Sequence, residues 1–275
     1  MCKAHADVPG LRYYYKDNSG PGQSRNFGVE KALGEYMIIL DSDVVLPECY
    51  LEAIDSSLEK EDCDAFGGSD AAAEDFTPVQ KAISYSMTSF FTTGGIRGGK
   101  RKLDRFYPRS FNMGIKKDVY EALGGFSKMR FGEDIDFSIR IIKGGYSCRL
   151  LPEAWVWHKR RTDFRKFFRQ VYNSGISIIN LYKKYPESLK LVHILPAAFT
   201  LSLIVLVPTG LILLFILLVG IDSTLKNKSL KVGLLSIWAA IVQLTGYGSG
   251  FIIAWWRRCV LGRDEFTAFN KTFYK

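Results

Sequence analysis

The sequence predicts an α/β domain followed by apolar helices that are long enough to enter a membrane. Over residues 1–158, short apolar segments alternate with amphipathic helical segments, which is the pattern of an α/β fold. Two blocks contain no Asp, Glu, Lys or Arg, and each is long enough to cross a bilayer. The chain of 275 residues is therefore expected to comprise four parts: a domain at 1–158, a basic amphipathic segment at 159–190, two transmembrane segments at 191–221 and 232–256, and a cytoplasmic tail at 257–275.

Charge and cysteine content narrow the class of protein. Residues 1–158 hold 20 Lys or Arg and 23 Asp or Glu, whereas residues 159–190 hold 9 and 2. The basic excess thus lies at the membrane edge, where it marks the cytoplasmic side and attracts anionic lipids, so nucleic acid is not expected as a partner. The five cysteines include no C-x-x-C pair, which indicates neither a disulfide framework nor a zinc site. We expect a protein of the inner, cytoplasmic membrane whose domain faces the cytoplasm.

The first half of the domain is predicted from turn residues and from apolar periodicity. A short strand from Leu11 leads through an Asn/Gly/Pro turn to a helix that begins near Ser24 and stops at Gly34. The segment Glu35–Asp43 is an apolar run ending in carboxylates, as in a buried strand of parallel type. The remaining elements are a helix at Pro47–Lys60, a strand at Cys63–Ser69 and a helix at Thr77–Phe91.

The second half of the domain begins with a Gly- and Arg-rich loop. Gly94, Gly99 and Lys100 match most of a phosphate-loop pattern, but Arg101 replaces the required Ser or Thr, so we expect a mobile basic loop instead. Beyond it, glycine pairs end two predicted helices, and the domain finishes in an extended strand. These elements are Val119–Phe126, Glu133–Tyr146 and Ser147–His158.

The basic segment contains an amphipathic helix. Its apolar positions follow i, i+3, i+4, i+7 spacing, with basic side chains on the other face, which predicts a helix in the membrane interface; a core helix of the domain is the alternative. The apolar positions are Phe164, Phe167, Phe168, Val171 and Tyr172.

The first apolar block is ambiguous because it is long and contains Pro196 and Pro208. We favour one kinked span over a tight hairpin. With one span in each block, the domain and the tail share the cytoplasmic side and the loop at 222–231 lies opposite. That loop carries three Lys against one Asp, which disagrees with this placement.

Three groups of side chains can carry chemistry. Asp41 and Asp43 follow an apolar strand, where two carboxylates can bind a divalent cation that in turn holds nucleotide phosphates. Glu133 and Asp134 begin a helix, and a carboxylate there can act as a general base. His158 ends the last strand and is a candidate metal ligand.

Together these segments resemble the inverting, family 2 nucleotide-sugar glycosyltransferases of the GT-A (Rossmann-like) fold. The resemblance covers about Tyr13 to His158 in the family's order and rests on four stretches: NSGPGQSRNFGVEKALGEYMIILDSDV, FNMGIKKDVYEALGGF, GEDIDFSIRIIKGGY and PEAWVWH. It implies an enzyme that transfers a sugar from a nucleotide-diphosphate donor, with inversion and with a divalent cation, Mg or Mn. The acceptor would be lipid-linked or a polysaccharide of the cell envelope.

The resemblance also assigns site residues. It makes Asp41 and Asp43 the metal-binding D-x-D pair, Asp134 the catalytic base and Glu133 an acceptor-orienting residue. In addition, Arg25 and Asn26 would lie beside the donor with Asp41, Asn112 on the acceptor side, and His158 at the metal. Acidic neighbours of Asp134, namely Glu133 and Asp136, are expected to raise its pKa.

Two departures from the family pattern qualify the resemblance. The family's first strands and their acidic D-G-S-like segment have no counterpart before Tyr13, so the chain resembles a member that lacks about its first 40 to 60 residues. Of the Q-x-x-R-W signature of processive synthases, the chain keeps only Gln170; Asn173 and Ser174 stand in place of the Arg and the Trp. This difference disfavours long-chain polymerisation. The competing hypothesis is a truncated, catalytically inactive membrane-anchored protein that binds a cation or a partner.

Overall fold

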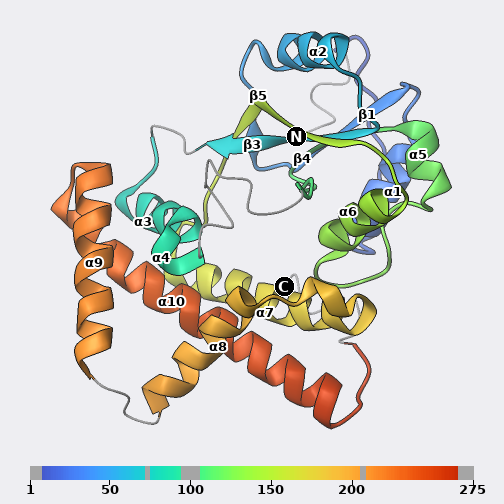
Figure 1. The fold of residues 1–275 in the computed structure, drawn as a ribbon. Helices are drawn as coiled ribbons and strands as arrows, with labels where there is room; N and C mark the ends of the chain where they lie inside the picture. Colours follow the sequence, from blue (N-terminus) through green and yellow to red (C-terminus); the bar gives the residue numbers. More distant parts are fainter. Residues whose placement is uncertain (1–7, 72–74, 94–105, 205–208, 266–275) are drawn as a thin grey trace.

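A five-stranded sheet forms the upper part of the molecule in the computed structural model, which describes residues 8–71, 75–93, 106–204 and 209–265 (Figure 1). Among the described strands, β3 and β5 are parallel neighbours and the other pairs are antiparallel. The strand order is β1 (Tyr36–Leu40), β4 (Asn112–Lys116), β3 (Ala65–Ala71), β5 (Cys148–His158) and β2 (Val44–Val45).

The sheet confirms three predicted strands and corrects others. β1, β3 and β5 lie where the apolar runs place them. However, β1 pairs antiparallel with β4 rather than in parallel, and β4 itself was not predicted. The strand expected from Leu11 is wrong, because residues 11–20 form no strand and Tyr13, Tyr14 and Tyr15 are exposed. An extended segment without a neighbouring strand leaves its backbone groups to water.

Local sequence explains where the domain helices begin and end. Pro21 occupies the first turn of α1 (Pro21–Lys31), where its missing N–H costs no hydrogen bond. Thr77 and Gln80 form a reciprocal capping box at the start of α3 (Pro78–Thr88). Three further helices match the prediction in position, although α5 ends before the glycine pair: α2 (Tyr50–Lys60), α5 (Lys117–Ala122) and α6 (Glu133–Lys143). The short α4 (Phe90–Thr93) completes the helix expected up to Phe91.

The amphipathic segment forms α7 (Phe164–Lys184), which begins at Asp163, whose side chain accepts a hydrogen bond from the Lys166 amide. Phe167 and Val171 are buried in one cluster with residues of α3 and of α10 (Leu230–Trp255). Two residues of the apolar face of α7 are therefore covered by protein, whereas Phe168 is 39% exposed. Whether α7 lies in the membrane interface or in the core of the domain stays a prediction.

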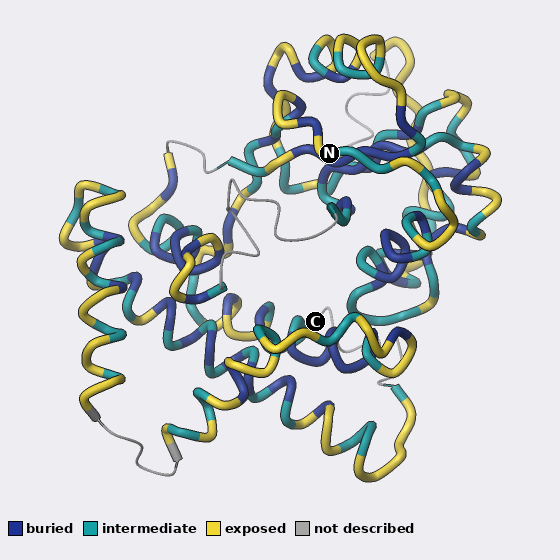
Figure 2. The backbone as a smooth tube through the Cα atoms, viewed as in Figure 1, coloured by how far each residue is buried: buried dark blue, intermediate teal, exposed yellow. Residues whose placement is uncertain are grey.

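Two helices replace the single kinked span that was favoured for the first apolar block. They are α8 (Leu191–Ile204), which contains Pro196, and α9 (Thr209–Asn227). Among the described residues, two helical stretches are long and apolar enough to cross a membrane by length and composition, Gly210–Asn227 and Leu230–Val260. Most positions in the first half of α9 are exposed (Figure 2).

Small residues let the helices below the sheet approach one another closely. A Cβ atom at Gly250 of α10 would lie 2.1 Å from the Tyr172 carbonyl oxygen of α7, and one at Gly248 would lie 2.2 Å from the Pro196 oxygen of α8. A side chain at either position would force the backbones apart. Glycines at such contacts allow the close helix packing common in membrane proteins.

Candidate active site

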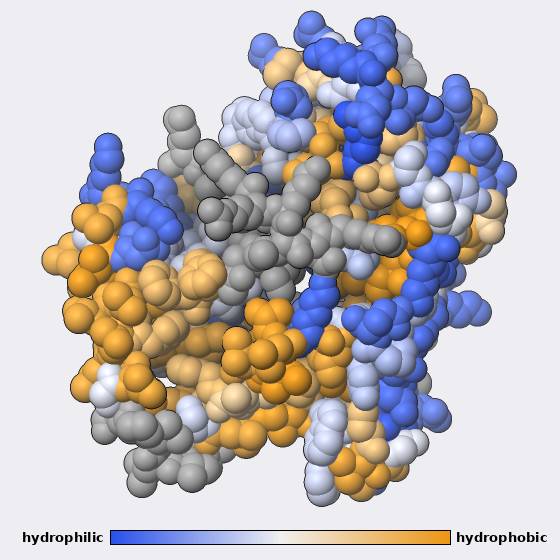
Figure 3. Space-filling model, in the orientation of Figure 1, coloured by the Kyte–Doolittle hydropathy of each residue, from blue (hydrophilic) through white to orange (hydrophobic). Residues whose placement is uncertain are grey.

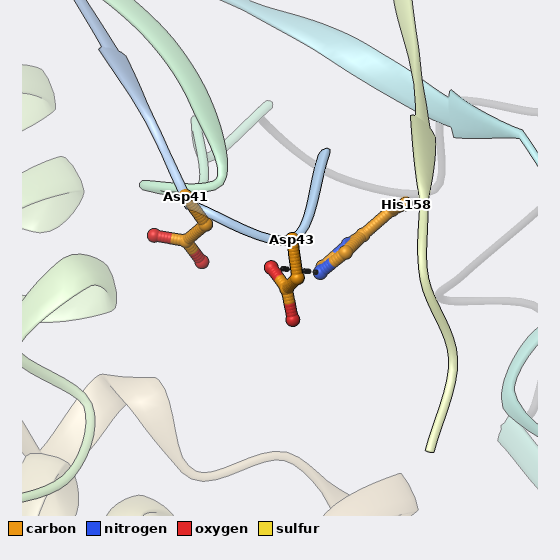
Figure 4. Close-up of side chains that lie close together, drawn as sticks. All are labelled: Asp41, Asp43 and His158. Atoms are coloured by element: carbon orange, nitrogen blue, oxygen red, sulfur yellow. Dashed lines mark ion pairs between the residues drawn. The ribbon is translucent and has the colours of Figure 1, made fainter. Parts of the chain in front are cut away.

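Three strand ends bring Asp41, Asp43 and His158 together. Asp41 directly follows β1, Asp43 directly precedes β2, and His158 is the last residue of β5. Because β2 pairs with β5, Val44 lies opposite His158, so the Asp43 carboxylate reaches the imidazole. One ligand atom from each of the three residues lies within 4.8 Å of the others, and Figure 4 shows the side chains converging on the same space. The sequence predicted all three.

The state of His158 suits a metal ligand. Its Nε2 lies 3.3 Å from Asp43 Oδ1, and its ring stacks on Phe111 at 5.0 Å between centroids. Burial lowers the pKa of His158 below its ordinary 6.5, although Asp43 opposes this shift. The imidazole is therefore neutral at pH 7 and has a lone pair to offer. Two carboxylates and a neutral imidazole are a donor set that fits Mg²⁺ or Mn²⁺.

The second acidic centre begins α6. Gly132 precedes it with φ +86°, a conformation that favours glycine, and a Cβ atom there would lie 2.3 Å from Ser177 Oγ of α7. Glycine thus lets the start of α6 rest directly on α7. This contact places Glu133 and Asp134 at the N-terminus of a helix, where the helix dipole favours negative charge.

Arg109 pairs with Asp134, and sequence reasoning did not find it. Arg109 Nε lies 2.7 Å from Asp134 Oδ2, while the Ile135 amide donates to Asp134 Oδ1 at 2.9 Å. Burial raises the pKa of Asp134, but Arg109 and the amide outweigh it and hold the pKa below its ordinary value. The expectation of a raised pKa for Asp134 is therefore wrong. Asp136 cannot raise it as supposed, because its own carboxylate is paired with Arg140 and Lys184.

Arg25 connects the two acidic centres. Its Nη2 lies 2.9 Å from Asp41 Oδ1, and its Nη1 lies 2.8 Å from Glu133 Oε1. Burial and the neighbouring Asp134 raise the pKa of Glu133, and Arg25 opposes that shift. The Arg25 guanidinium therefore holds Asp41 and Glu133 at a fixed distance from each other.

Asn112 does not face the acceptor side as expected. Its side chain is fully buried, where Oδ1 accepts from Tyr50 Oη at 2.6 Å and Nδ2 donates to the Ala154 carbonyl at 2.8 Å. The amide ties β4 to α2 and β5, so both of its polar groups are occupied within the core.

Asn26 is likewise occupied by the protein. Its Nδ2 donates to the Phe126 carbonyl at 2.9 Å, and its Oδ1 accepts from the Phe126 amide at 2.8 Å and from Tyr120 Oη. The side chain fastens α1 to the turn after α5. This role fixes the helix that carries Arg25, and it engages both the amide and the carbonyl of Asn26 within the protein.

Basic side chains border the metal-site candidates. Arg160 Nη2 lies 2.6 Å from Asp70 Oδ2, and Arg161 Nη1 lies 3.7 Å from Asp43 Oδ2. The sequence placed these arginines at the membrane edge rather than at the site. The basic loop expected to cover the site, residues 94–105, lies outside the described residues.

Comparisons with known proteins agree with this geometry. Residues 1–124 match the family model "Glycosyl transferase family 2". The Pre-mycofactocin glycosyltransferase of Mycobacterium tuberculosis is 26% identical over 267 residues, covering 88% of this chain and 54% of that protein. The probable glycosyltransferase YdaM of Bacillus subtilis is 30% identical over 59 residues, which cover 22% of this chain and 14% of that protein. The chain thus spans about half the length of its Mycobacterium relative.

A solved structure shares the fold. The mannosyltransferase PcManGT of Pyrobaculum calidifontis, in complex with GDP-Man and Mn²⁺, superposes with a TM-score of 0.55 at 15% identity, covering 93% of this chain and 72% of that chain. The sheet and its helices therefore share the GT-A fold, and apolar helices follow them. Residues 1–124, a little under half of the chain, are similar to glycosyl transferase family 2.

Proposed function

We propose that this protein is a membrane-bound glycosyltransferase that transfers a sugar from a nucleotide-diphosphate donor, with inversion, to a lipid-linked or polysaccharide acceptor in cell-envelope glycan synthesis. The reaction would take place at the cytoplasmic face of the inner membrane. One observation carries the proposal: Arg25 joins the Asp41–Asp43–His158 group, through Asp41, to Glu133 at the start of α6. The similarity of residues 1–124 to glycosyl transferase family 2 supplies the reaction class.

The triad would hold the cation. Asp41, Asp43 and His158 offer two carboxylate oxygens and one neutral nitrogen within 4.8 Å of one another. A divalent cation bound there would neutralise charge on the departing nucleoside diphosphate. PcManGT was solved with GDP-Man and Mn²⁺, which supports a cation of this kind without deciding between Mg²⁺ and Mn²⁺.

Asp134 would serve as the general base. Inversion by a single displacement requires a group that takes the proton from the acceptor hydroxyl as that oxygen attacks the anomeric carbon. Asp134 is ionised because Arg109 holds its pKa low, so it can accept a proton at neutral pH. Arg109 also orients the carboxylate, and an incoming hydroxyl would take a place beside Oδ2 that Arg109 now occupies alone.

Glu133 and Arg25 would position the reactants. Arg25 is 15% exposed and contacts carboxylates of both centres, so it fixes the distance between donor and base. Glu133 lies next to the base and is paired through Oε1, which leaves Oε2 to orient an acceptor. Arg25 and Glu133 would thus accelerate the reaction by holding the reactants close together, not by transferring a proton.

Sugar transfer by membranes that contain the full chain tests the proposal. Such membranes are incubated with Mn²⁺ and radiolabelled nucleotide sugars, GDP-mannose among them, and sugar is counted in the lipid extract and in the glycan fraction. We expect incorporation that disappears with EDTA and in the Asp134→Asn variant. Equal incorporation by Asp134→Asn membranes would refute the proposal. Metal-dependent nucleotide binding without any transfer would instead favour a cation-binding membrane protein.

A further inference from the structure

We infer that the apolar helices α8, α9 and α10 enter one leaflet of the bilayer and return to the domain's side, so that the chain is attached to the membrane without crossing it. The lipid leaflet on the domain's side covers the exposed apolar surface of these helices. This differs from the sequence-based expectation of two spans with the 222–231 loop on the opposite side. It does not depend on the proposed reaction.

The chain enters the apolar region from the domain's side. Lys184, at the end of α7, lies 2.5 Å from Asp136 of α6. Three residues further, Glu187 Oε1 lies 2.5 Å from Lys143 Nζ, also of α6. The first residue of α8, Leu191, follows only four positions later. The start of α8 is therefore fixed beside the catalytic helix.

The far end of α9 is also fastened to the domain. Tyr85 of α3 donates a hydrogen bond from Oη to Asp222 Oδ2 at 2.6 Å, and Lys226 Nζ lies 2.9 Å from the same oxygen. Tyr85 is buried, and α3 is the first described helix after β3 in the chain. Asp222 cannot reach Tyr85 if a bilayer separates them. The chain thus returns to its starting side before α10 begins.

The helix α10 lies along the base of the domain instead of leading away from it. Near its start, Val232 and Ala239 share a buried cluster with Phe167 and Val171 of α7. Near its end, Phe251 and Ala254 share another with three isoleucines of α7, Ile176, Ile178 and Ile179. The two helices therefore run side by side in the same direction over most of their length.

Both ends of α7 are held to the domain, and this fixes the course of α10. The Gln80 side chain of α3 donates to the Arg160 carbonyl at 3.1 Å, just before α7, and Lys184 at its other end pairs with Asp136. A helix packed along α7 cannot cross the membrane while α7 stays beneath the domain. Figure 1 shows α7 and α10 below the sheet.

The segment after α10 returns to the domain as well. Glu265 Oε1 accepts a hydrogen bond from the Arg130 amide at 3.3 Å, in the loop that leads to Gly132 and α6. The Asn180 side chain of α7 joins Glu265 at 3.3 Å and Arg258 at 3.3 Å. The residues that follow α10 therefore lie on the same side as the catalytic carboxylates.

Helix lengths agree with a re-entrant hairpin. The 14 residues of α8 measure about 21 Å and the 19 residues of α9 about 28 Å, at about 1.5 Å per residue. The apolar part of α9 before Asp222 measures only about 20 Å, so it and α8 are both shorter than the roughly 30 Å hydrocarbon core. α8 also packs against the middle of α10, where Thr200 Oγ1 lies 3.3 Å from the Leu244 carbonyl oxygen.

The exposed leucines of α9 and the lysines near its end indicate that lipid covers the apolar surface of these helices. Apolar side chains gather over the lower left of Figure 3, where Figure 1 places α9 and α10. The described part of α9 exposes five leucines in its first half: Leu211, Leu213, Leu214, Leu217 and Leu218. Lys226, Lys228 and Lys231 would all lie at the headgroups of the domain-side leaflet. The positive charge of the 222–231 loop, which contradicted a two-span topology, agrees with this one.

Cysteine labelling in sealed vesicles tests the inference. In the full chain, all five cysteines are replaced, the buried Cys63 and the half-buried Cys148 by Ala and the others by Ser. One cysteine is then returned at a time: Cys49 in the domain, Lys228→Cys in the α9–α10 turn, or Arg263→Cys after α10. Vesicles with the domain outside and vesicles with the domain inside are each treated with a membrane-impermeant maleimide, before and after detergent is added.

We expect all three positions to react in the same orientation. Reaction of position 228 from the side opposite to Cys49 would establish crossing by α8–α9 and would overturn the inference. Reaction of position 263 from the opposite side would show that α10 crosses, with the same consequence. Reaction of position 228 only after detergent would place the turn within the lipid and would also contradict it.

Trypsin digestion of the unmodified chain checks the result without any substitution. In vesicles that expose the domain, trypsin should cut at Lys226, Lys228 or Lys231; in vesicles of the opposite orientation it should not. Cleavage in the opposite orientation would overturn the inference. Because neither readout uses sugar transfer, failure of this inference and failure of the proposed function are distinguishable.

Discussion

Arg109 Nε lies 2.7 Å from Asp134 Oδ2, and this ion pair determines the charge of the proposed base. Asp134 lies in the first turn of α6, where burial by itself would raise its pKa and favour the protonated carboxyl. Arg109 reverses that tendency and holds the pKa of Asp134 below its ordinary value. The carboxylate therefore has the charge of a base before any substrate binds.

Removing the Arg109 guanidinium should make Asp134 harder to ionise. In Arg109→Gln, burial continues to raise the pKa of Asp134 while the main opposing charge is gone. The acid limb of the kcat/KM profile should then move to higher pH. Arg149→Gln, which breaks a pair with Glu61 at the edge of the domain, is the control and should leave the profile in place. An unshifted acid limb in Arg109→Gln would show that Asp134 is not the titrating base.

Replacing the base should affect turnover and leave donor binding intact. Asp134→Asn keeps the shape of the side chain but removes its ability to take a proton, so kcat should fall by about 10²–10⁴-fold. Glu133→Gln is the matched variant, and it should act mainly through the KM of the acceptor. The measurement is steady-state transfer together with donor affinity. Near-normal turnover in Asp134→Asn would rule out its role.

Loss of one triad carboxylate should weaken metal-dependent nucleotide binding. Asp43→Asn removes a charge and a ligand atom close to His158. Affinity for GDP in the presence of Mn²⁺, measured by calorimetry, should fall by at least about 10-fold. Asp55→Asn on the exposed face of α2 is the control and should bind normally. Equal affinities for the two variants would exclude Asp43 as a ligand.

Asn112 should matter for stability rather than for the acceptor. Asn112→Ala leaves Tyr50 Oη and the Ala154 carbonyl without their buried partner. Each unsatisfied group costs about 1–3 kcal/mol, so the unfolding midpoint of the detergent-solubilised chain should fall clearly. A raised acceptor KM with an unchanged unfolding midpoint would show instead that Asn112 contributes to acceptor binding.

Much of the fold was predictable because its elements carry local signals. The carboxylates that end β1 and begin α6, and the proline and glycine residues at helix ends, appear directly in the sequence. β4 was missed because Asn112 and Gly114 are poor strand formers. Both serve the tertiary structure: the Asn112 amide bonds inside the core, and the lack of a side chain at Gly114 makes room for the Phe66 ring.

The remainder depends on contacts between distant residues. The metal-site residues could be found because Asp41 and Asp43 follow one apolar strand and His158 ends another, but Arg109 becomes a partner of Asp134 only when β4 and α6 pack together. Asn26 matches a family motif, yet its polar atoms are used by Phe126. Hydropathy likewise indicates that α9 is apolar, whereas the hydrogen bond from Tyr85 to Asp222 shows that its C-terminal part lies against α3.

Electron paramagnetic resonance of Mn²⁺ can show whether Asp41, Asp43 and His158 hold a divalent cation that carries a nucleoside diphosphate. The full chain is loaded with Mn²⁺ and GDP at pH 7, where His158 is neutral. Pulsed spectra should show coupling to ³¹P of the diphosphate and to one imidazole nitrogen, and the nitrogen coupling should vanish in His158→Ala. If the spectra with protein equal those of Mn²⁺ or of Mn²⁺ and GDP without protein, these three residues do not hold the cation.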